Sequence, residues 1–207
     1  MKNDSKLSLA PDFPDGAESR SAQKRRLRKV LLAARDAMPP DEKTALDDTL
    51  CQKIAALPCV LSASAILVYY PVGSEVNLLP LAKLAAAKGI PVGFPVCKTN
   101  PKNLIFRKAD DQTVFLAGAF GIPEPPTSAP EISFDRESVC LLPALGYDRS
   151  LARLGYGGGY YDRVLKDFPG KKIGVCAERF LSDTVFAEPH DVAADLLVTE
   201  NRILTAK

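Results

Sequence analysis

Residues 139–162, VCLLPALGYDRSLARLGYGGGYYD, decide the fold class of this 207-residue chain. The stretch begins with four apolar residues, Val139–Leu142, which are typical of a buried strand, and Pro143 ends the run. Four glycines follow between positions 155 and 159, and a helical pattern continues over 160–168. A strand, a glycine-rich turn and a helix in this order indicate an open α/β sheet, in which ligands bind beyond the carboxyl ends of the strands.

The segments on either side of this stretch also alternate between strand and helix patterns, which favours a parallel sheet covered by helices. We therefore predict an α/β fold: a three-layer αβα domain with a mainly parallel central sheet, preceded by two N-terminal helices. A proline-rich connection over 118–135 is expected to wrap the surface. The expected helices span 19–38, 40–57 and 78–88, and the other expected strands span 65–70, 91–96, 104–108, 172–176 and 196–199.

Length and composition fit one globular domain, which we expect over residues 19–207. Hydrophobic residues make up 46% of the chain and charged residues 25%, and no apolar stretch approaches the roughly 18 residues of a membrane span. Residues 1–18 are polar and include four acidic residues, a composition that fits neither a signal peptide nor a transit peptide. We expect a disordered tail there, and a monomeric, cytoplasmic protein.

Several common kinds of active site are excluded or disfavoured. The chain has one histidine, His190, and its five cysteines include no C-x-x-C pair, which argues against a cysteine-based zinc site. No G-x-S-x-G, G-x-x-x-x-G-K-[ST] or G-x-G-x-x-G motif occurs. We interpret His190-Asp191 as a surface or capping pair and the cysteines as free thiols.

Seven basic residues fall between positions 20 and 35, with no acidic residue among them. Two interpretations stay open: a solvated helix face, or an anion site. Lys24 and Arg28 are four residues apart, so on a helix they share a face and can clamp phosphates. Nucleic acid is a weaker alternative, because the net charge is only +2 and the run has no aromatic side chain for stacking.

The glycine-rich turn carries the residue types of a nucleotide or phosphate site. Its glycines let backbone N–H groups point at an anion, and the following helix adds its positive end. An arginine offers a forked cation, an aspartate suits Mg²⁺, and three tyrosines offer flat surfaces for a ring. These candidates are Arg153, Gly155, Tyr156, Gly157, Gly158, Gly159, Tyr160, Tyr161 and Asp162.

Tyr70 and Glu75 stand just after the expected strand over 65–70. This is again a carboxyl end of a parallel strand, so we expect both residues at the same edge of the sheet as the glycine-rich turn. Glu75 is a candidate to hydrogen-bond the polar edge of a heterocycle. An exposed loop acid is the alternative interpretation.

The segment LPALGYD at 142–148, followed by RLGYGGGYYD at 153–162, resembles the signature of the 5-formyltetrahydrofolate cyclo-ligase family, also called 5,10-methenyltetrahydrofolate synthetase. Three weaker matches occur in the order in which the family has them. They are Lys24-x-x-Leu27-Arg28, the strand and loop that end at Glu75, and GIPEP at 121–125. The resemblance covers nearly the whole chain, from residue 22 to residue 200.

The resemblance implies an ATP- and Mg²⁺-dependent closure of 5-formyltetrahydrofolate to 5,10-methenyltetrahydrofolate, with ADP and phosphate as products. It implies small-molecule substrates and no role for nucleic acid or membrane. The implied catalytic residues are Arg153, Tyr160 and Asp162, with Asp162 as the magnesium ligand. The implied ATP-binding residues are Lys24, Arg28, Arg153, Gly155, Tyr156, Gly157, Gly158, Gly159, Tyr160 and Tyr161. The implied folate-binding residues are Tyr70, Glu75, Tyr156, Gly157, Gly158, Gly159 and Tyr160.

Three positions depart from the family pattern near these residues. Leu151 stands where the family usually has glycine, so the loop before Arg153 is expected to take another shape. Asn77 and Leu78 replace an acidic residue and a threonine, which puts the folate contacts on that side in question.

Two alternative functions fit parts of the sequence. One is a non-catalytic nucleotide- or folate-binding protein whose basic helix contacts RNA or a partner. The other is a sugar-phosphate isomerase, for which the sequence offers no second acid–base pair of comparable quality.

Overall fold

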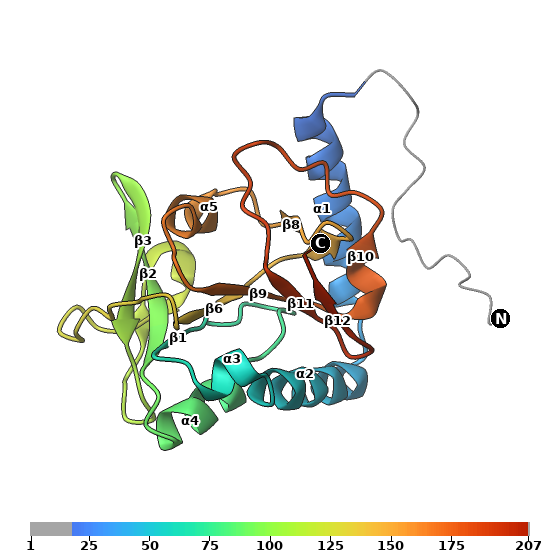
Figure 1. Cartoon of the computed structure of the whole chain (residues 1–207). Helices are drawn as coiled ribbons and strands as arrows, with labels where there is room; N and C mark the ends of the chain where they lie inside the picture. The colour runs from blue at the N-terminus through green and yellow to red at the C-terminus, as the bar shows by residue number, and fades with distance from the viewer. Residues whose placement is uncertain (1–17, 207) are drawn as a thin grey trace.

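A seven-stranded sheet forms the centre of the protein in the computed structural model, which describes residues 18–206 (Figure 1). Its strand order is β12-β11-β9-β6-β1-β2-β3, and the four inner pairs are parallel, whereas β12 and β3 run antiparallel at the two edges. The prediction of a mainly parallel sheet is confirmed. The strands are β1 (Ile66–Leu67), β2 (Val92–Thr99), β3 (Lys102–Lys108), β6 (Val139–Leu142), β9 (Lys171–Val175), β11 (Leu196–Val198) and β12 (Ile203–Thr205).

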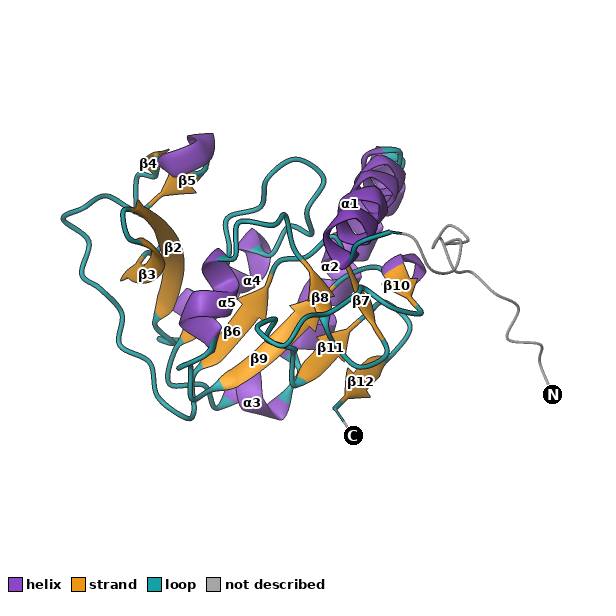
Figure 2. Ribbon diagram, turned by 90° about the horizontal axis from the view of Figure 1, so that it is seen from above, coloured by secondary structure: helices purple, strands orange, loops and turns teal. Residues whose placement is uncertain are grey.

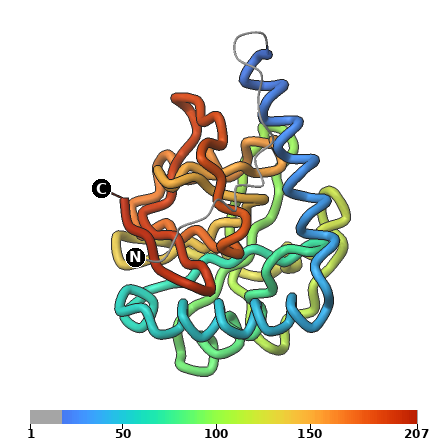
Figure 3. Tube along the Cα trace, turned by 90° about the vertical axis from the view of Figure 1, so that its right-hand side faces the viewer, coloured from blue at the N-terminus to red at the C-terminus, as the bar shows by residue number. Residues whose placement is uncertain are grey.

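Helices cover both faces of the sheet, as predicted for a three-layer arrangement. Helices α2, α3 and α4 lie on one face and α5 on the other, and Figure 2 shows α5 together with β7 and β8 on the near side of the sheet. Figure 3 shows α1 along one side of the molecule before α2 crosses beneath the sheet. The helices are α1 (Arg20–Asp36), α2 (Pro40–Ala55), α3 (Pro58–Leu61), α4 (Leu79–Ala87) and α5 (Tyr160–Leu165).

Strand β6 shows why a run of apolar residues belongs at the centre of such a sheet. Val139 and Leu141 pack into one core cluster, whereas Cys140 and Leu142 pack into a second cluster on the other face. Successive side chains of a strand point to opposite faces, so a strand covered on both sides is apolar at every position. All four residues are at most 1% exposed.

Local signals explain where the N-terminal helices begin. The Ser19 hydroxyl accepts a hydrogen bond from the Ala22 N–H and caps α1, and Pro40 occupies the first turn of α2 with Asp41 and Glu42 beside it. Pro58 does not simply end the second helix, because the short helix α3 begins there. The expected helix over 160–168 is shorter than predicted, since α5 ends at Leu165.

A small second sheet was not predicted. Strands β10 (Leu181–Ser182), β7 (Gly146–Asp148) and β8 (Arg153–Leu154) form it, and the β7–β8 hairpin brings Arg153 to the edge of the central sheet. The proline-rich connection contains a third, two-stranded sheet, made of β4 (Leu116–Ala117) and β5 (Pro123–Glu124), with short 3₁₀ turns at 119–121 and, further along the chain, at 178–180.

The expected tail over residues 1–18 lies almost wholly outside the described residues, as does Lys207. Within residues 18–206, none of the helices has the length and apolar character that crossing a membrane requires.

Candidate functional site

The basic helix and the glycine loop, residues 155–159, meet at the carboxyl edge of the sheet. The Arg28 Nε donates a hydrogen bond of 2.8 Å to the Gly155 carbonyl, across 127 positions of sequence. Gly157 has a φ of +96°, and a Cβ at this position would lie 3.3 Å from the Arg28 guanidinium carbon. A glycine is therefore needed both for the backbone conformation and for the close approach of the cation.

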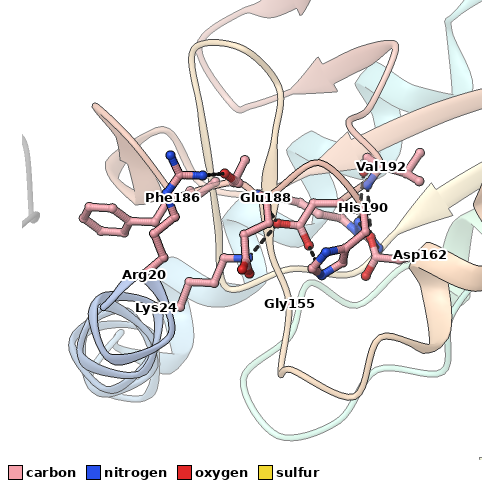
Figure 4. A network of polar contacts seen from close by, with 12 residues as sticks. Arg20, Lys24, Gly155, Asp162, Phe186, Glu188, His190 and Val192 are labelled. Atoms are coloured by element: carbon pink, nitrogen blue, oxygen red, sulfur yellow. Dashed lines mark hydrogen bonds and ion pairs between the residues drawn. The ribbon is translucent and has the colours of Figure 1, made fainter. Parts of the chain in front are cut away.

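Lys24 lies in the same interface, one helical turn before Arg28. It is 7% exposed, and its Nζ contacts Glu188 Oε2 at 2.7 Å and Asp191 Oδ2 at 2.6 Å (Figure 4). Burial by itself lowers the pKa of Lys24, but the hydrogen bonds to Asp191 and Glu188 outweigh it, so the pKa is raised and the amine stays charged. Burial of Lys24 excludes the interpretation of the whole basic run as a solvated face.

Arg153 is not a free forked cation in this structure, because it is paired with Asp162. Its Nη1 and Nη2 donate to Asp162 Oδ1 at 2.9 and 2.8 Å, and Nη1 also donates to the Val192 carbonyl at 3.0 Å. The Val192 N–H donates to the same Asp162 oxygen at 3.1 Å (Figure 4). The glycine loop and the segment over 188–192 are thus held together by the two residues that bracket the loop.

The tyrosines of the loop take three different positions. Tyr156 is 54% exposed, Tyr160 meets the ring of Phe120 edge-on at 5.8 Å, and Tyr161 packs against both core clusters. The hydroxyl oxygens of Tyr160 and Tyr161 are buried without a hydrogen-bond partner among the described residues. Burial raises the pKa of Tyr161 well above its ordinary value. The Tyr161 ring thus contributes to packing, whereas Tyr156 and Tyr160 border the loop.

Glu75 is buried rather than an exposed loop acid. It is 6% exposed, and its Oε2 accepts a hydrogen bond of 2.9 Å from the Val72 N–H. Burial raises its pKa, while the Val72 N–H and the charge of Arg35 act in the opposite direction. Burial raises the pKa of Tyr156 and the nearby charge of Glu75 raises it further, so the loop that contains Glu75 and the glycine loop lie close together.

Tyr70 precedes Glu75 by five residues, but its ring packs in a separate aromatic cluster. Its ring centroid is 6.3 Å from that of Phe94 and 5.1 Å from that of Phe115, and these two rings meet edge-on at 5.0 Å. The Tyr70 ring is therefore fixed in place by packing, next to the loop that begins at Pro71.

Arg35 is the residue of this region that the sequence analysis did not assign. It is 5% exposed, and it donates to Ser74 Oγ at 2.9 Å, to the Ala144 carbonyl at 3.4 Å and to the Tyr156 hydroxyl at 2.5 Å. Its guanidinium carbon also lies 5.7 Å from the centre of the Tyr156 ring. A helical signal existed in the sequence, since Arg35 follows Lys24 and Arg28 at spacings of eleven and seven residues.

A pocket opens between the end of α1, the start of α2 and the carboxyl ends of β1, β6 and β9, which is where an open α/β sheet binds ligands. Most of its wall is apolar, and a few polar groups point into it. The polar lining residues are Arg35, Lys43, Tyr69, Ser74 and Glu75, and the apolar ones include Met38, Pro143, Leu145, Val175 and Phe180.

No preformed metal centre exists among residues 18–206, where no group of three or more His, Cys, Asp and Glu side chains is placed to hold an ion. The five cysteines are free, as expected. The His190 side chain is 72% exposed and lies 3.7 Å from Asp191, which confirms a surface position.

The departures from the family pattern have structural explanations. Leu151 adopts a φ of +63°, the left-handed conformation that favours glycine, while its side chain is fully buried. Leu151 therefore occupies a conformation that glycine adopts without strain, and the expectation of a different loop shape stays a prediction. The Asn77 side chain accepts a hydrogen bond from the Leu79 N–H at the start of α4, and Leu78 is a core residue with no exposed surface.

Comparisons with known proteins identify the family of this chain. The family model described as the 5-formyltetrahydrofolate cyclo-ligase family matches residues 20–200. The chain belongs to this family, whose members are enzymes. A 5-formyltetrahydrofolate cyclo-ligase of Mycolicibacterium smegmatis is 34% identical over 88% of this chain and 96% of the relative. The enzyme of the same name from Mycoplasma pneumoniae is 29% identical over 86% of this chain and 98% of the relative.

Solved structures place the cyclo-ligase fold over the same length. The structure of a 5,10-methenyltetrahydrofolate synthetase from Aquifex aeolicus matches with a TM-score of 0.75 at 27% identity, over 88% of this chain and 92% of that one. The synthetase from Mycoplasma pneumoniae matches with a TM-score of 0.67 at 26% identity, over 86% of this chain and 98% of that one.

Proposed function

We propose that the protein converts 5-formyltetrahydrofolate to 5,10-methenyltetrahydrofolate, using ATP and Mg²⁺ and releasing ADP and phosphate. One observation carries the proposal: the basic helix, the glycine loop and the Glu75 loop, residues 71–78, converge at the carboxyl edge of the sheet. Family membership supports the reaction, and the convergence supports two adjacent subsites, one for a polyanion and one for a heterocycle.

The reaction makes modest demands on the protein. The formyl group is amide-like, so its oxygen is a weak nucleophile and its carbon a weak electrophile. Transfer of the γ-phosphoryl group to this oxygen turns it into a leaving group and releases ADP. The N10 amine then attacks the formyl carbon, the carbon–oxygen bond breaks, phosphate departs and N10 loses its proton. Positioning and charge neutralisation are the main tasks, as in other phosphoryl transfers.

We assign the ATP side of the site to Lys24, Arg28, Arg153 and the backbone of the glycine loop. Arg28 already holds the loop through the Gly155 carbonyl, and Lys24 contributes a buried positive charge one turn away. Because Lys24 is balanced by Glu188 and Asp191, phosphate oxygens would share it with these carboxylates. Together these groups supply the positive field in which charge develops on the transferred phosphoryl group.

Asp162 fits the proposed role of magnesium ligand. All three hydrogen bonds that its carboxylate accepts within the described residues end on Oδ1, so Oδ2 remains for a cation. Mg²⁺ characteristically uses one or two carboxylates together with substrate phosphates, so a cluster of three protein ligands is not required. When bound, the ion would neutralise charge on the phosphates, and Arg153 would keep the carboxylate oriented.

We assign the folate side to Tyr70, Glu75, Tyr156 and Tyr160, with the glycine loop between the two substrates. Glu75 presents a carboxyl group beside a mostly apolar wall, and this carboxyl group would hydrogen-bond the polar edge of a heterocycle. Burial raises the pKa of Glu75, and both the neutral and the charged form of its carboxyl group can hydrogen-bond to a ligand. The exposed Tyr156 ring offers a surface on which a ring can stack.

A direct assay tests the proposal. Purified protein is mixed with 5-formyltetrahydrofolate, ATP and MgCl₂, and the absorbance of the methenyl product is followed, with matched reactions lacking ATP or containing EDTA. We expect product only in the complete mixture. Absence of ATP-dependent product refutes the proposal, and RNA binding that weakens steeply with salt would then favour the non-catalytic alternative.

A further inference from the structure

Arg35 is buried at the last turn of α1, and its hydrogen-bond acceptors are a hydroxyl, a carbonyl and a phenol, which are all neutral. A buried charge costs stability unless it is well compensated. Part of the compensation comes from Glu75, whose carboxyl interacts with the charge of Arg35 in the pocket that both residues line, although none of the hydrogen bonds that Arg35 makes within residues 18–206 ends on a carboxylate. The arrangement therefore indicates that the guanidinium has a task other than packing.

The contacts of Arg35 join three parts of the chain that lie far apart in the sequence. Ser74 belongs to the Glu75 loop, Ala144 follows β6, and Tyr156 belongs to the glycine loop. The Ser74 hydroxyl in turn donates to Asp36, the residue after Arg35, so the Glu75 loop is attached twice to the end of α1. One planar group thus fixes both loops against the same helix.

We propose that Arg35 is a positioning residue that holds Tyr156 against the Glu75 loop and thereby shapes the folate side of the site. The inference rests on the proposed function. Arg35 acts through Tyr156 rather than on the reacting atoms. Its planar fork is the feature that matters, because a lysine ammonium is a single point and cannot hold two separated acceptors in one plane. ATP binding depends on Lys24 and Arg28, which lie two to three turns away on the same helix.

The test is a double-mutant cycle on kcat/KM for 5-formyltetrahydrofolate, with Arg35→Gln, Tyr156→Phe and the double variant. We expect Arg35→Gln to lower this constant at least about tenfold in the wild-type background, the loss typical of one hydrogen bond to a charged group. In the Tyr156→Phe background the same change should cost less than about threefold, because the acceptor hydroxyl is already gone. The KM for ATP should change by less than about twofold.

Two further variants separate positioning from folding. Arg25→Gln removes an exposed cation from the same helix and should leave both KM values unchanged. Arg35→Lys keeps the charge and should recover less than half of the loss on a logarithmic scale. Urea unfolding of every variant shows whether it is folded in the assay.

The outcomes are decisive in each case. Equal losses from Arg35→Gln in the two backgrounds overturn the inference, as do parallel rises of the KM for folate and the KM for ATP. If Arg35→Gln does not fold, Tyr156→Phe tests the inference instead, because the Tyr156 side chain is half-exposed and its replacement should not prevent folding. An unchanged KM for folate in Tyr156→Phe then overturns the inference. A wild-type protein without ATP-dependent product refutes the proposed function instead, so the two failures are distinguishable.

Discussion

Leu151 allows a stability prediction with a definite sign. The residue belongs to a three-residue hairpin loop between β7 and β8, closed by a hydrogen bond of 3.1 Å from the Asp148 N–H to the Ala152 carbonyl. Such loops normally place glycine at their last position, which has a positive φ. Leu151 has a φ of +63° there and no exposed surface. Its side chain stabilises the core while its backbone is strained.

Replacement by alanine and by glycine separates these two contributions. Leu151→Ala should lower the free energy of unfolding by about 3–5 kcal/mol, the range for leucines deleted from a packed core. Glycine at an ordinary strand position is about 0.5–1 kcal/mol worse than alanine. At a left-handed position, however, glycine avoids about 1–2 kcal/mol of strain that alanine retains. Leu151→Gly should therefore equal Leu151→Ala or exceed it in stability by up to about 1.5 kcal/mol.

Urea unfolding measures both variants, and Leu142 provides the matched control. Leu142 lies in β6, has no exposed surface and packs in the same core cluster as Leu151, without a positive φ. At Leu142, glycine should be less stable than alanine by about 0.5–1 kcal/mol. If glycine is also less stable than alanine at Leu151 by a similar amount, the loop is not strained and the reasoning fails.

Three further predictions concern the proposed site. Asp162→Asn should raise the Mg²⁺ concentration for half-maximal activity at least about tenfold, because an uncharged amide is a poor ligand for this ion; an unchanged Mg²⁺ titration removes Asp162 from the metal. Lys24→Met should raise the KM for ATP about tenfold, because it removes a cation that binds phosphate. Glu188→Gln leaves Asp191 in place and should change the KM for ATP less than about twofold. If ATP titrations show the same change in KM for both variants, the role of Lys24 is contradicted. Glu75→Gln should gain stability over the wild type as pH rises from about 4 to about 8. Burial raises the pKa of Glu75, so its ionisation at higher pH lowers the free energy of unfolding of the wild type but not that of the variant. Urea unfolding at the two pH values measures this. If the stability difference between variant and wild type is the same at both, the raised pKa of Glu75 is contradicted.

The sequence was sufficient to predict the parts of the fold that depend on local pattern. The boundaries of β6 match the apolar run over 139–142, because a strand buried on both faces has no polar position. Strands β7, β8 and β10 were missed, since segments of two or three residues carry no period and form only where tertiary contacts pair them. The positive φ of Leu151 was not predicted, because a residue's φ cannot be inferred from its identity when burial in the core favours a large side chain.

The sequence was sufficient to propose the residues of the candidate site, but not the partners that the structure gives them. The glycine loop and Glu75 were each recognised from residue type and from their place after a strand. The ion pairs of Lys24 were not, because Glu188 and Asp191 lie 164 and 167 positions away in the sequence. The pairing of Arg153 with Asp162 was also missed, although only nine positions separate them, because each residue alone suggests a ligand contact.

The basic residues of α1 do not all lie on one face of the helix. Lys24, Leu27, Arg28, Leu31 and Arg35 follow helical spacing and share the face that meets the two loops, with Leu27 and Leu31 fully buried. Long basic side chains bury their stems beside such leucines while their heads reach polar partners at the rim. Arg28 and Arg35 are two turns apart, so along the helix axis their heads are separated by about 10 Å. A single rigid helix therefore sets the spacing between the loop assigned to ATP and the loop assigned to folate, and a phosphoryl group can pass between two substrates only if that spacing is held.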